Sequence, residues 1–222
     1  MQGLIGPLKE LAEFEELCKN KKKDAGMIRV CGCVNSQKSH MMYALGDGCK
    51  YKVIACSSET KAKQIYEEYR FLDSNTYLYP AKDFLFYQAD IRSKELVKQR
   101  MEGIQAVLSG EPVTVVTSLD GFMDHLAPKE SIAEKVLKIQ NDSVLKLDEM
   151  AEKLSVIGYD REVQVEGPGQ FAVRGGILDI YPLTEELPVR IELWGDEVDS
   201  IRTFDVESQR SIENLMDIVI YP

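Results

Sequence analysis

The sequence predicts two domains of different fold class: an α/β domain with a parallel sheet, then a smaller α+β domain of antiparallel strands. Apolar segments up to residue 126 alternate between strand-like and helix-like periods, which favours a parallel sheet flanked by helices. From residue 170, short strand-like runs are separated by glycine-containing turns, as in antiparallel hairpins. Residues 1–124 are neutral overall, whereas residues 125–222 carry the whole net charge of −10, so we place the domain boundary at residue 126.

Apolar spacing and turn residues define the elements of the first domain. Apolar positions three and four apart mark helices, and short runs rich in valine and isoleucine mark buried strands. Pro80 ends one strand, and Gly110 ends the last helix. In chain order we expect a helix over residues 4–11, a strand at 27–31, a helix at 39–45, a strand at 53–56, a helix at 62–69, a strand at 77–79, a helix at 97–108 and a strand at 113–117.

The second domain is expected to begin with a helix and to continue as hairpins. The helix spans residues 143–157, with a cap in Asn141-Asp142-Ser143 and a stop at Gly158. Gly175-Gly176 and Gly195-Asp196 supply tight turns between the strands that follow. These strands are expected at residues 170–174, 177–181, 189–194 and 198–204.

The composition argues against several classes of protein. A net charge of −10 disfavours a protein that grips nucleic-acid phosphates with its whole surface. No run of apolar residues is long enough for a membrane span, and no signal peptide is evident, so we expect a cytoplasmic protein. The five cysteines are odd in number and lie early in the chain, which favours reduced thiols. Their spacing and the presence of only two histidines predict no metal site.

The segment from Gly32 to Ser39 matches a phosphate-binding loop, G-x-x-x-x-G-K-[ST], at every position but one. Lys38 and Ser39 fit the pattern, but Gln37 stands where the second glycine must let the backbone approach phosphate. No acidic motif for magnesium follows the strand at 113–117. The segment can be a chance strand–turn–helix junction, an intact nucleotide site or a degenerate remnant that no longer hydrolyses ATP. We favour the remnant, and so predict a degenerate P-loop-type first domain with no catalytic residues and no cofactor.

The strand at 189–194 alternates strictly between apolar and other residues. Its apolar positions are expected to face the core, which leaves Arg190 and Trp194 on the opposite face. By the same alternation, Arg174 points away from the core on the strand at 170–174. An exposed tryptophan near arginines is typical of a protein-binding hot spot. In the alternative interpretation, Trp194 packs at the domain edge and the arginines pair with the many carboxylates of this domain.

Two blocks of this region resemble a signature shared by the UvrB family of excision-repair proteins and the bacterial transcription-repair coupling factors. They are residues 169–182, GQFAVRGGILDIYP, and residues 189–202, VRIELWGDEVDSIR, and the likeness continues through residues 204–211. A weaker resemblance covers the rest of the chain. The coupling factors fit better, because UvrB has an intact phosphate loop and a long DNA-wedging hairpin. Here Gln37 interrupts the loop, and residues 80–91 leave little room for that hairpin.

The resemblance implies a UvrB-like adaptor at the start of a longer protein. The implied domains are residues 1–126 (domain 1a), residues 127–208 (domain 2, which interacts with UvrA) and residues 209–222, the start of the return to the first domain. It also implies that Arg174, Arg190 and Trp194 recruit the damage-recognition ATPase UvrA, and we expect replacement of Arg190 to weaken binding without affecting stability. The full-length coupling factor would use ATP and Mg²⁺ in motor domains, bind RNA polymerase and double-stranded DNA, and cover this face with its own C-terminal domain.

Two rival functions stay open at this point. The first is the N-terminal part of a UvrB-like ATPase, against which Gln37 argues. The second is a DNA-binding module, which the excess of acidic residues in the second domain disfavours.

Overall fold

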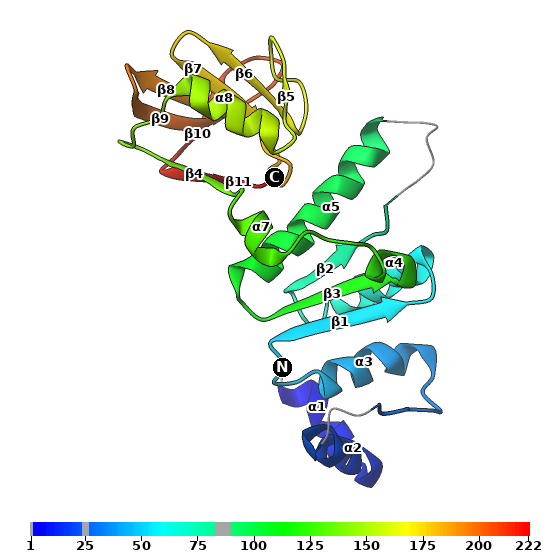
Figure 1. Ribbon diagram of the computed structural model, residues 1–222. Coiled ribbons are helices and arrows are strands. Elements are labelled where there is room, and N and C mark those ends of the chain that lie inside the picture. Colours follow the sequence, from blue (N-terminus) through cyan, green and yellow to red (C-terminus); the bar gives the residue numbers. More distant parts are fainter. Residues whose placement is uncertain (1, 24–26, 83–89) are drawn as a thin grey trace. The chain divides into compact units, whose positions relative to one another are not determined.

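A computed structural model describes residues 2–23, 27–82 and 90–222 of the chain. The chain divides into two compact units (Figure 1). The first unit consists of residues 1–82 and 109–124, and the second consists of residues 83–108 and 125–222. The described helices include none that is long and apolar enough to cross a membrane.

The first unit is built on a parallel sheet of three strands, in the order β1-β3-β2, which confirms the predicted α/β class. Helix α4 packs on this sheet, with Ala62 and Ile65 buried against Val116 of β3. Ser58 caps α4 by accepting a hydrogen bond from the Lys61 backbone N–H at 3.3 Å. The elements are α1 (Gln2–Lys9), α2 (Ala12–Lys23), α3 (Asn35–Leu45), β1 (Tyr51–Cys56), α4 (Glu59–Tyr69), β2 (Thr76–Tyr79), β3 (Val113–Ser118) and α6 (Leu119–Phe122).

The strand predicted at residues 27–31 is wrong. This segment has no regular secondary structure, and Met27 is 97% exposed. The apolar residues of the segment are therefore not a sign that it is buried in a sheet. Strand β3 already has β1 on one side and β2 on the other, which leaves the segment no place beside the most buried strand of the sheet. Gly32, with φ +88°, then turns the chain toward α3.

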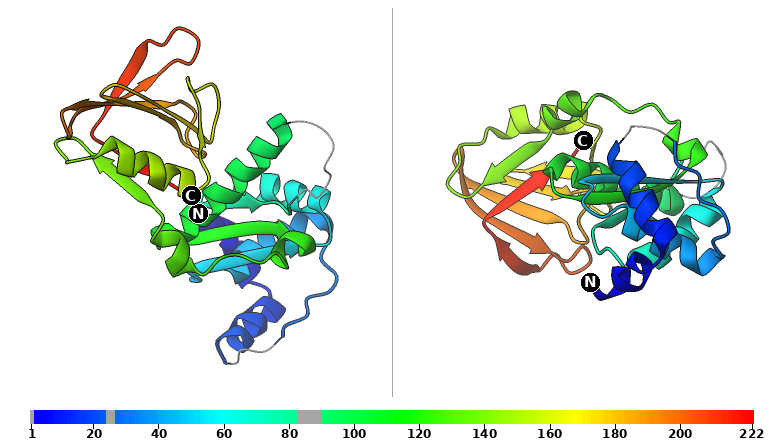
Figure 2. Two further views of the ribbon diagram at one scale, coloured as in Figure 1. Left: turned by 45° about the horizontal axis from the view of Figure 1, so that its top comes forward. Right: turned by 90° about the horizontal axis from the view of Figure 1, so that it is seen from below.

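The second unit contains a six-stranded sheet covered on one face by helix α8, which appears yellow-green in Figure 2. The strand order is β10-β9-β8-β7-β6-β5, and every neighbouring pair is antiparallel except β5 with β6. A separate pair, β4 with β11, completes the unit. The elements are α5 (Asp90–Ser109), α7 (Lys129–Ala133), β4 (Leu137–Gln140), α8 (Leu147–Val156), β5 (Asp160–Arg161), β6 (Gln170–Arg174), β7 (Ile177–Tyr181), β8 (Val189–Trp194), β9 (Glu197–Phe204), β10 (Ser211–Leu215) and β11 (Asp217–Ile220).

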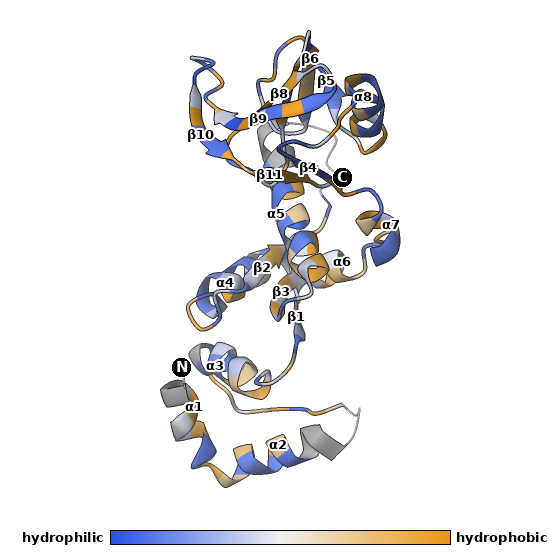
Figure 3. Cartoon of the chain, turned by 90° about the vertical axis from the view of Figure 1, so that its left-hand side faces the viewer, coloured by the Kyte–Doolittle hydropathy of each residue, from blue (hydrophilic) through white to orange (hydrophobic). Residues whose placement is uncertain are grey.

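The hydrophobic core of the second unit lies between α8 and the sheet. Leu154 of α8 is fully buried with Leu178 and Ile191, which stand opposite each other on β7 and β8. Figure 3 shows hydrophobic positions among hydrophilic ones along β9, but the buried residues Val198, Ile201 and Phe204 stand three apart and not two, and the register with β8 shifts at Glu192/Leu193. The antiparallel strands predicted from period-two patterning at 170–174, 177–181 and 189–194 are confirmed.

Helix α8 begins four residues later than predicted, at Leu147. The expected cap region instead bonds to the β8–β9 hairpin: the Val198 N–H donates to the Ser143 carbonyl at 2.9 Å, and the Leu145 N–H donates to the Asp196 carbonyl at 2.7 Å. These backbone bonds hold residues 143–145 against the hairpin, after a turn at Asp142 with φ +62°, and the helix starts only after them. The sequence patterns did not identify β4, β5 or β10, because these strands are short or largely exposed.

Candidate protein-binding site

The sheet of the second unit has an outer face, opposite α8, that carries an unusual set of charged side chains. Strand register places Asp179 of β7 directly opposite Arg190 of β8, and Arg190 opposite Arg202 of β9. Val189 and Ile191, on either side of Arg190, are buried in the core. The predicted alternation along β8 is therefore confirmed, and Arg190 lies on the outer face.

Asp179 is the centre of this outer face. Its side chain is only 1% exposed and accepts hydrogen bonds from two arginines. Arg190 Nε donates to Oδ1 at 2.7 Å and Arg190 Nη2 donates to Oδ2 at 2.9 Å, while Arg174 Nη2 donates to Oδ2 at 2.6 Å. A buried carboxylate requires such pairing to offset its lost hydration. The sequence analysis did not predict Asp179 as a site residue. A charged residue within the otherwise apolar strand at 177–181 was the feature that could have identified it.

Arg190 is less accessible than the sequence predicts. Its side chain is 14% exposed, and its guanidinium carbon lies 4.4 Å from the ring centroid of Phe204, which is fully buried. Nη2 also donates to Gln209 Oε1 at 2.8 Å. The hydrogen bond with Asp179 raises the pKa of Arg190. Alternation identified the face correctly, but the turn between β9 and β10 covers part of that face, and the hydrogen bonds of Arg190 within the chain argue against the expectation that its replacement leaves stability unaffected.

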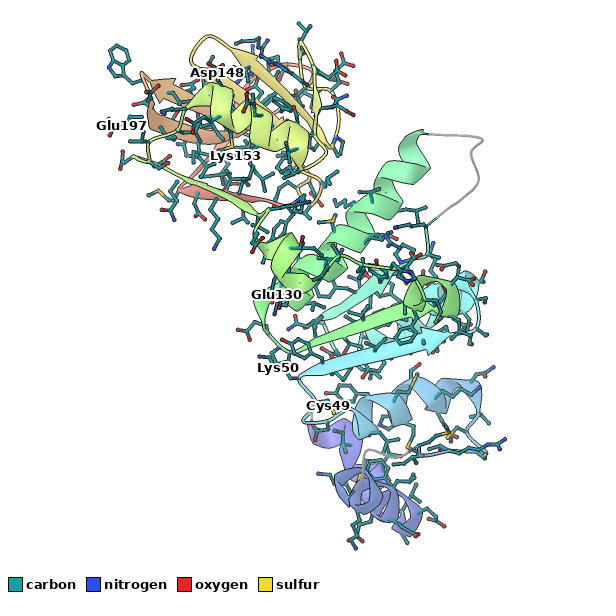
Figure 4. The ribbon with its side chains drawn as sticks, viewed as in Figure 1. Cys49, Lys50, Glu130, Asp148, Lys153 and Glu197 are labelled. Atoms are coloured by element: carbon teal, nitrogen blue, oxygen red, sulfur yellow. The ribbon has the colours of Figure 1, made fainter. Side chains whose placement is uncertain are left out.

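Arg174 and Trp194 are the accessible members of the predicted set. The Arg174 side chain is 44% exposed, and Trp194 is 86% exposed. Trp194 stands opposite Glu197, which Figure 4 labels, and Glu197 in turn forms a bridge with Val144, which is 78% exposed. Strand pairing thus places two large exposed apolar side chains on either side of one carboxylate. Val144 was not predicted, because it precedes α8 in the sequence and reaches this place only through the bridge.

A second ion pair lies beside the first on the outer face. Glu192 forms an ion pair with Arg202 and accepts a hydrogen bond from Ser200 Oγ at 3.3 Å. Among the ion pairs of the described residues, Arg174, Arg190 and Arg202 share two carboxylates, those of Asp179 and Glu192. The carboxylate of Glu197, opposite Trp194, balances the third arginine, so these six side chains carry no net charge although residues 125–222 carry −10. The face is suited to a polar partner surface with acceptor groups and an apolar recess for the indole.

Comparisons with known proteins match this region and the whole chain. Residues 137–222 match the family model described as UvrB interaction domain. The transcription-repair-coupling factor of Bacillus subtilis (strain 168) is 33% identical over 218 residues, which is 97% of this chain.

The chain is similar to the transcription-repair coupling factors over almost its whole length.

Other relatives agree with this similarity and with the resemblance seen in the sequence. The transcription-repair-coupling factor of Staphylococcus epidermidis (strain ATCC 35984) is 38% identical over 67% of this chain. That of Staphylococcus aureus (strain Mu50) is 36% identical over 68% of this chain. The chain spans 18% of the Bacillus relative and 13% of each Staphylococcus relative.

The residues of the predicted phosphate loop do not form the expected strand–loop–helix arrangement. Helix α3 begins at Asn35, so Gln37 lies in its first turn, where Gln37 Oε1 accepts from the Val34 N–H at 3.3 Å. Lys38 Nζ donates to Asn35 Oδ1 at 3.0 Å. Ser39 is buried, and its hydroxyl donates to Glu68 Oε2 at 2.8 Å. The P-loop-type character of the first domain is therefore not confirmed in residues 27–45.

The first unit also contains an open cleft of about 510 Å³, whose lining includes Cys49 and Lys50. Figure 4 labels these two residues. The lining of the cleft also includes Lys52 and Asp73, whose Nζ and Oδ2 form an ion pair at 2.7 Å. Burial acts to raise the pKa of Asp73, but hydrogen bonds from Lys52 and Thr114 outweigh it and lower that pKa. The charges of this pair thus neutralise each other. Among the described residues, no cluster of three His, Cys, Asp or Glu side chains could hold a metal ion.

Proposed function

We propose that the outer face of the second unit recruits the excision-repair ATPase UvrA, and that the chain is an adaptor within a transcription-repair coupling factor. The observation that carries the proposal is Trp194, 86% exposed on the face that also carries the paired arginines Arg174, Arg190 and Arg202. Support comes from the match of residues 137–222 to the UvrB interaction domain and from relatives whose name couples transcription to repair.

Trp194 and Arg174 can each make contacts with a partner that they do not make within the chain. Tryptophan and arginine dominate binding hot spots, because each offers a large contact area and a directional polar group. Trp194 gains most from a partner, since its indole has little burial within the chain. Arg174 donates one hydrogen bond to Asp179, and its guanidinium has further N–H donors to offer a partner.

The activity of the full-length protein follows as part of the same proposal. The coupling factor would recognise RNA polymerase stalled at a DNA lesion and release it by ATP-dependent translocation on double-stranded DNA in the cytoplasm. ATP and Mg²⁺ would act in its motor domains, while this chain needs no cofactor and hydrolyses no ATP. Its C-terminal domain would cover the UvrA-binding face until it is needed, because an intramolecular contact masks a site at high effective concentration.

A pull-down with purified UvrA tests the recruitment. The chain should retain UvrA, and Trp194→Ala should retain far less of it. Lys153→Ala is a matched control, because Lys153 is exposed on α8, on the other side of the sheet (Figure 4). Equal retention by Trp194→Ala and Lys153→Ala would place UvrA elsewhere.

A further inference from the structure

Arg190 uses its guanidinium within the protein. Two of its nitrogens bond Asp179, Nη2 also donates to Gln209 Oε1, and Nη1 lies 3.5 Å from the Gln209 carbonyl oxygen. A guanidinium has five N–H donors, so most are committed. The side chain is also only 14% exposed, so Arg190 would affect a partner mainly by positioning other groups of the chain, and less by direct contact.

The first such group is Arg174. Asp179 Oδ2 accepts from Arg174 Nη2 at 2.6 Å and from Arg190 Nη2 at 2.9 Å. Arg190 binds both oxygens of this carboxylate, which fixes its orientation. The exposed Arg174 therefore donates its hydrogen bond to a carboxylate whose orientation is fixed by the less exposed Arg190.

The second such group is the turn at residues 205–210, which joins β9 to β10. Gln209 has φ +59°, a left-handed conformation that costs a side-chain-bearing residue on the order of 1 kcal/mol. The Gln209 N–H donates to the Asp205 carbonyl at 2.8 Å, and Gln209 Nε2 donates to the Val206 carbonyl at 2.7 Å. Arg190 completes this set from the neighbouring strand pair, and its guanidinium and the fully buried Phe204 lie at the base of the turn.

We propose that Arg190 is a positioning residue, and that the turn at residues 205–210 is a further part of the UvrA-binding surface beside Arg174 and Trp194. The proposal rests on the function proposed above. Phe204 lies under the guanidinium of Arg190, which places the turn at the margin of the same outer face. The turn exposes the side chains of Glu207, Ser208 and Arg210, which form a polar rim of the kind that surrounds a hot spot.

Hydrogen exchange in the free chain tests the positioning role without UvrA. Gln209→Gly removes the acceptor for Arg190 but tolerates a positive φ, so its melting temperature should stay within about 2 °C of the unaltered chain. The amides of residues 205–210 should nevertheless exchange faster in Gln209→Gly and in Arg190→Lys. Gln209→Glu, which keeps an oxygen acceptor for Arg190 but loses the Nε2 donor to Val206, should exchange more slowly than Gln209→Gly. Unchanged exchange in both Gln209→Gly and Arg190→Lys would overturn the positioning role.

A UvrA titration tests whether the turn belongs to the binding surface. Gln209→Gly should weaken binding about fivefold, as expected for one lost hydrogen bond, whereas Gln209→Glu should bind more tightly than Gln209→Gly and Lys153→Ala should bind as the unaltered chain does. The amides of residues 205–210 should also become protected in the complex. If the unaltered chain binds but the turn stays unprotected and Gln209→Gly binds equally well, the turn is not part of the surface. If the unaltered chain itself does not bind, the recruitment proposal fails, and the exchange experiment alone decides the role of Arg190.

Discussion

Replacing Arg190 by alanine should destabilise the second unit as well as weaken UvrA binding. The substitution removes two hydrogen bonds from the Asp179 carboxylate, which is 1% exposed, and uncovers Phe204. Removing one partner of a buried ion pair costs about 3–5 kcal/mol. Arg174 still contacts Asp179, so we expect the lower end, about 3 kcal/mol. For a domain of about 100 residues this lowers the melting temperature by at least about 10 °C.

Thermal unfolding followed by circular dichroism measures this effect directly. Arg174→Ala is the matched control, because it removes one contact to the same carboxylate from a side chain that is 44% exposed. It should cost about 1 kcal/mol or less, since solvent screens an exposed pair and Arg190 keeps both its bonds to Asp179. If Arg190→Ala melts within about 2 °C of the unaltered chain, the network around Asp179 does not stabilise the fold as argued.

Three further outcomes are expected. Asp73→Asn should destabilise the first unit at pH 7 but much less near pH 3. The pKa of Asp73 is lowered in the folded chain, so its carboxylate contributes stability at pH values above the unfolded-state pKa, and this stability is lost as pH falls through the folded-state pKa. Urea unfolding at the two pH values measures the difference. Ser58→Ala should cost about 1 kcal/mol by removing the cap of α4, and unchanged urea stability would exclude that role. The chain should release no more phosphate from ATP than a Lys38→Ala control does. The reason is that Gln37 lies within α3 and the Ser39 hydroxyl donates its hydrogen bond to Glu68. Steady-state phosphate release that depends on Lys38 would contradict this prediction.

Sequence patterns predicted the elements that face one hydrophobic core. Strict alternation in residues 189–194 identified the two faces of β8, because a period of two leaves a strand only one way to bury its apolar side chains. The same reasoning failed at residues 27–31, where apolar residues lie exposed without a neighbouring strand. Composition indicates that a segment can form a strand. Whether it does so depends on whether the other strands of the sheet leave an edge free for it to pair with.

The candidate site was predicted only in part, for a related reason. Arg174, Arg190 and Trp194 were found on one face, but alternation says nothing about what covers that face. Gln209 reaches Arg190 because the turn after β9 bends back in a left-handed conformation, which glutamine rarely adopts. Val144 joins Glu197 through a bridge between segments far apart in the sequence. Such contacts depend on tertiary geometry, which no local pattern encodes.

A calorimetric titration of UvrA tests the central claim most directly. The unaltered chain and the double variant Arg174→Ala/Trp194→Ala would be compared at matched salt, with Lys153→Ala as the control on α8. Both altered side chains are exposed, so the double variant should remain folded. We predict that it binds UvrA at least about a hundredfold more weakly than the unaltered chain, since two hot-spot side chains are lost. Equal dissociation constants for a folded double variant and the unaltered chain would contradict recruitment of UvrA by this face.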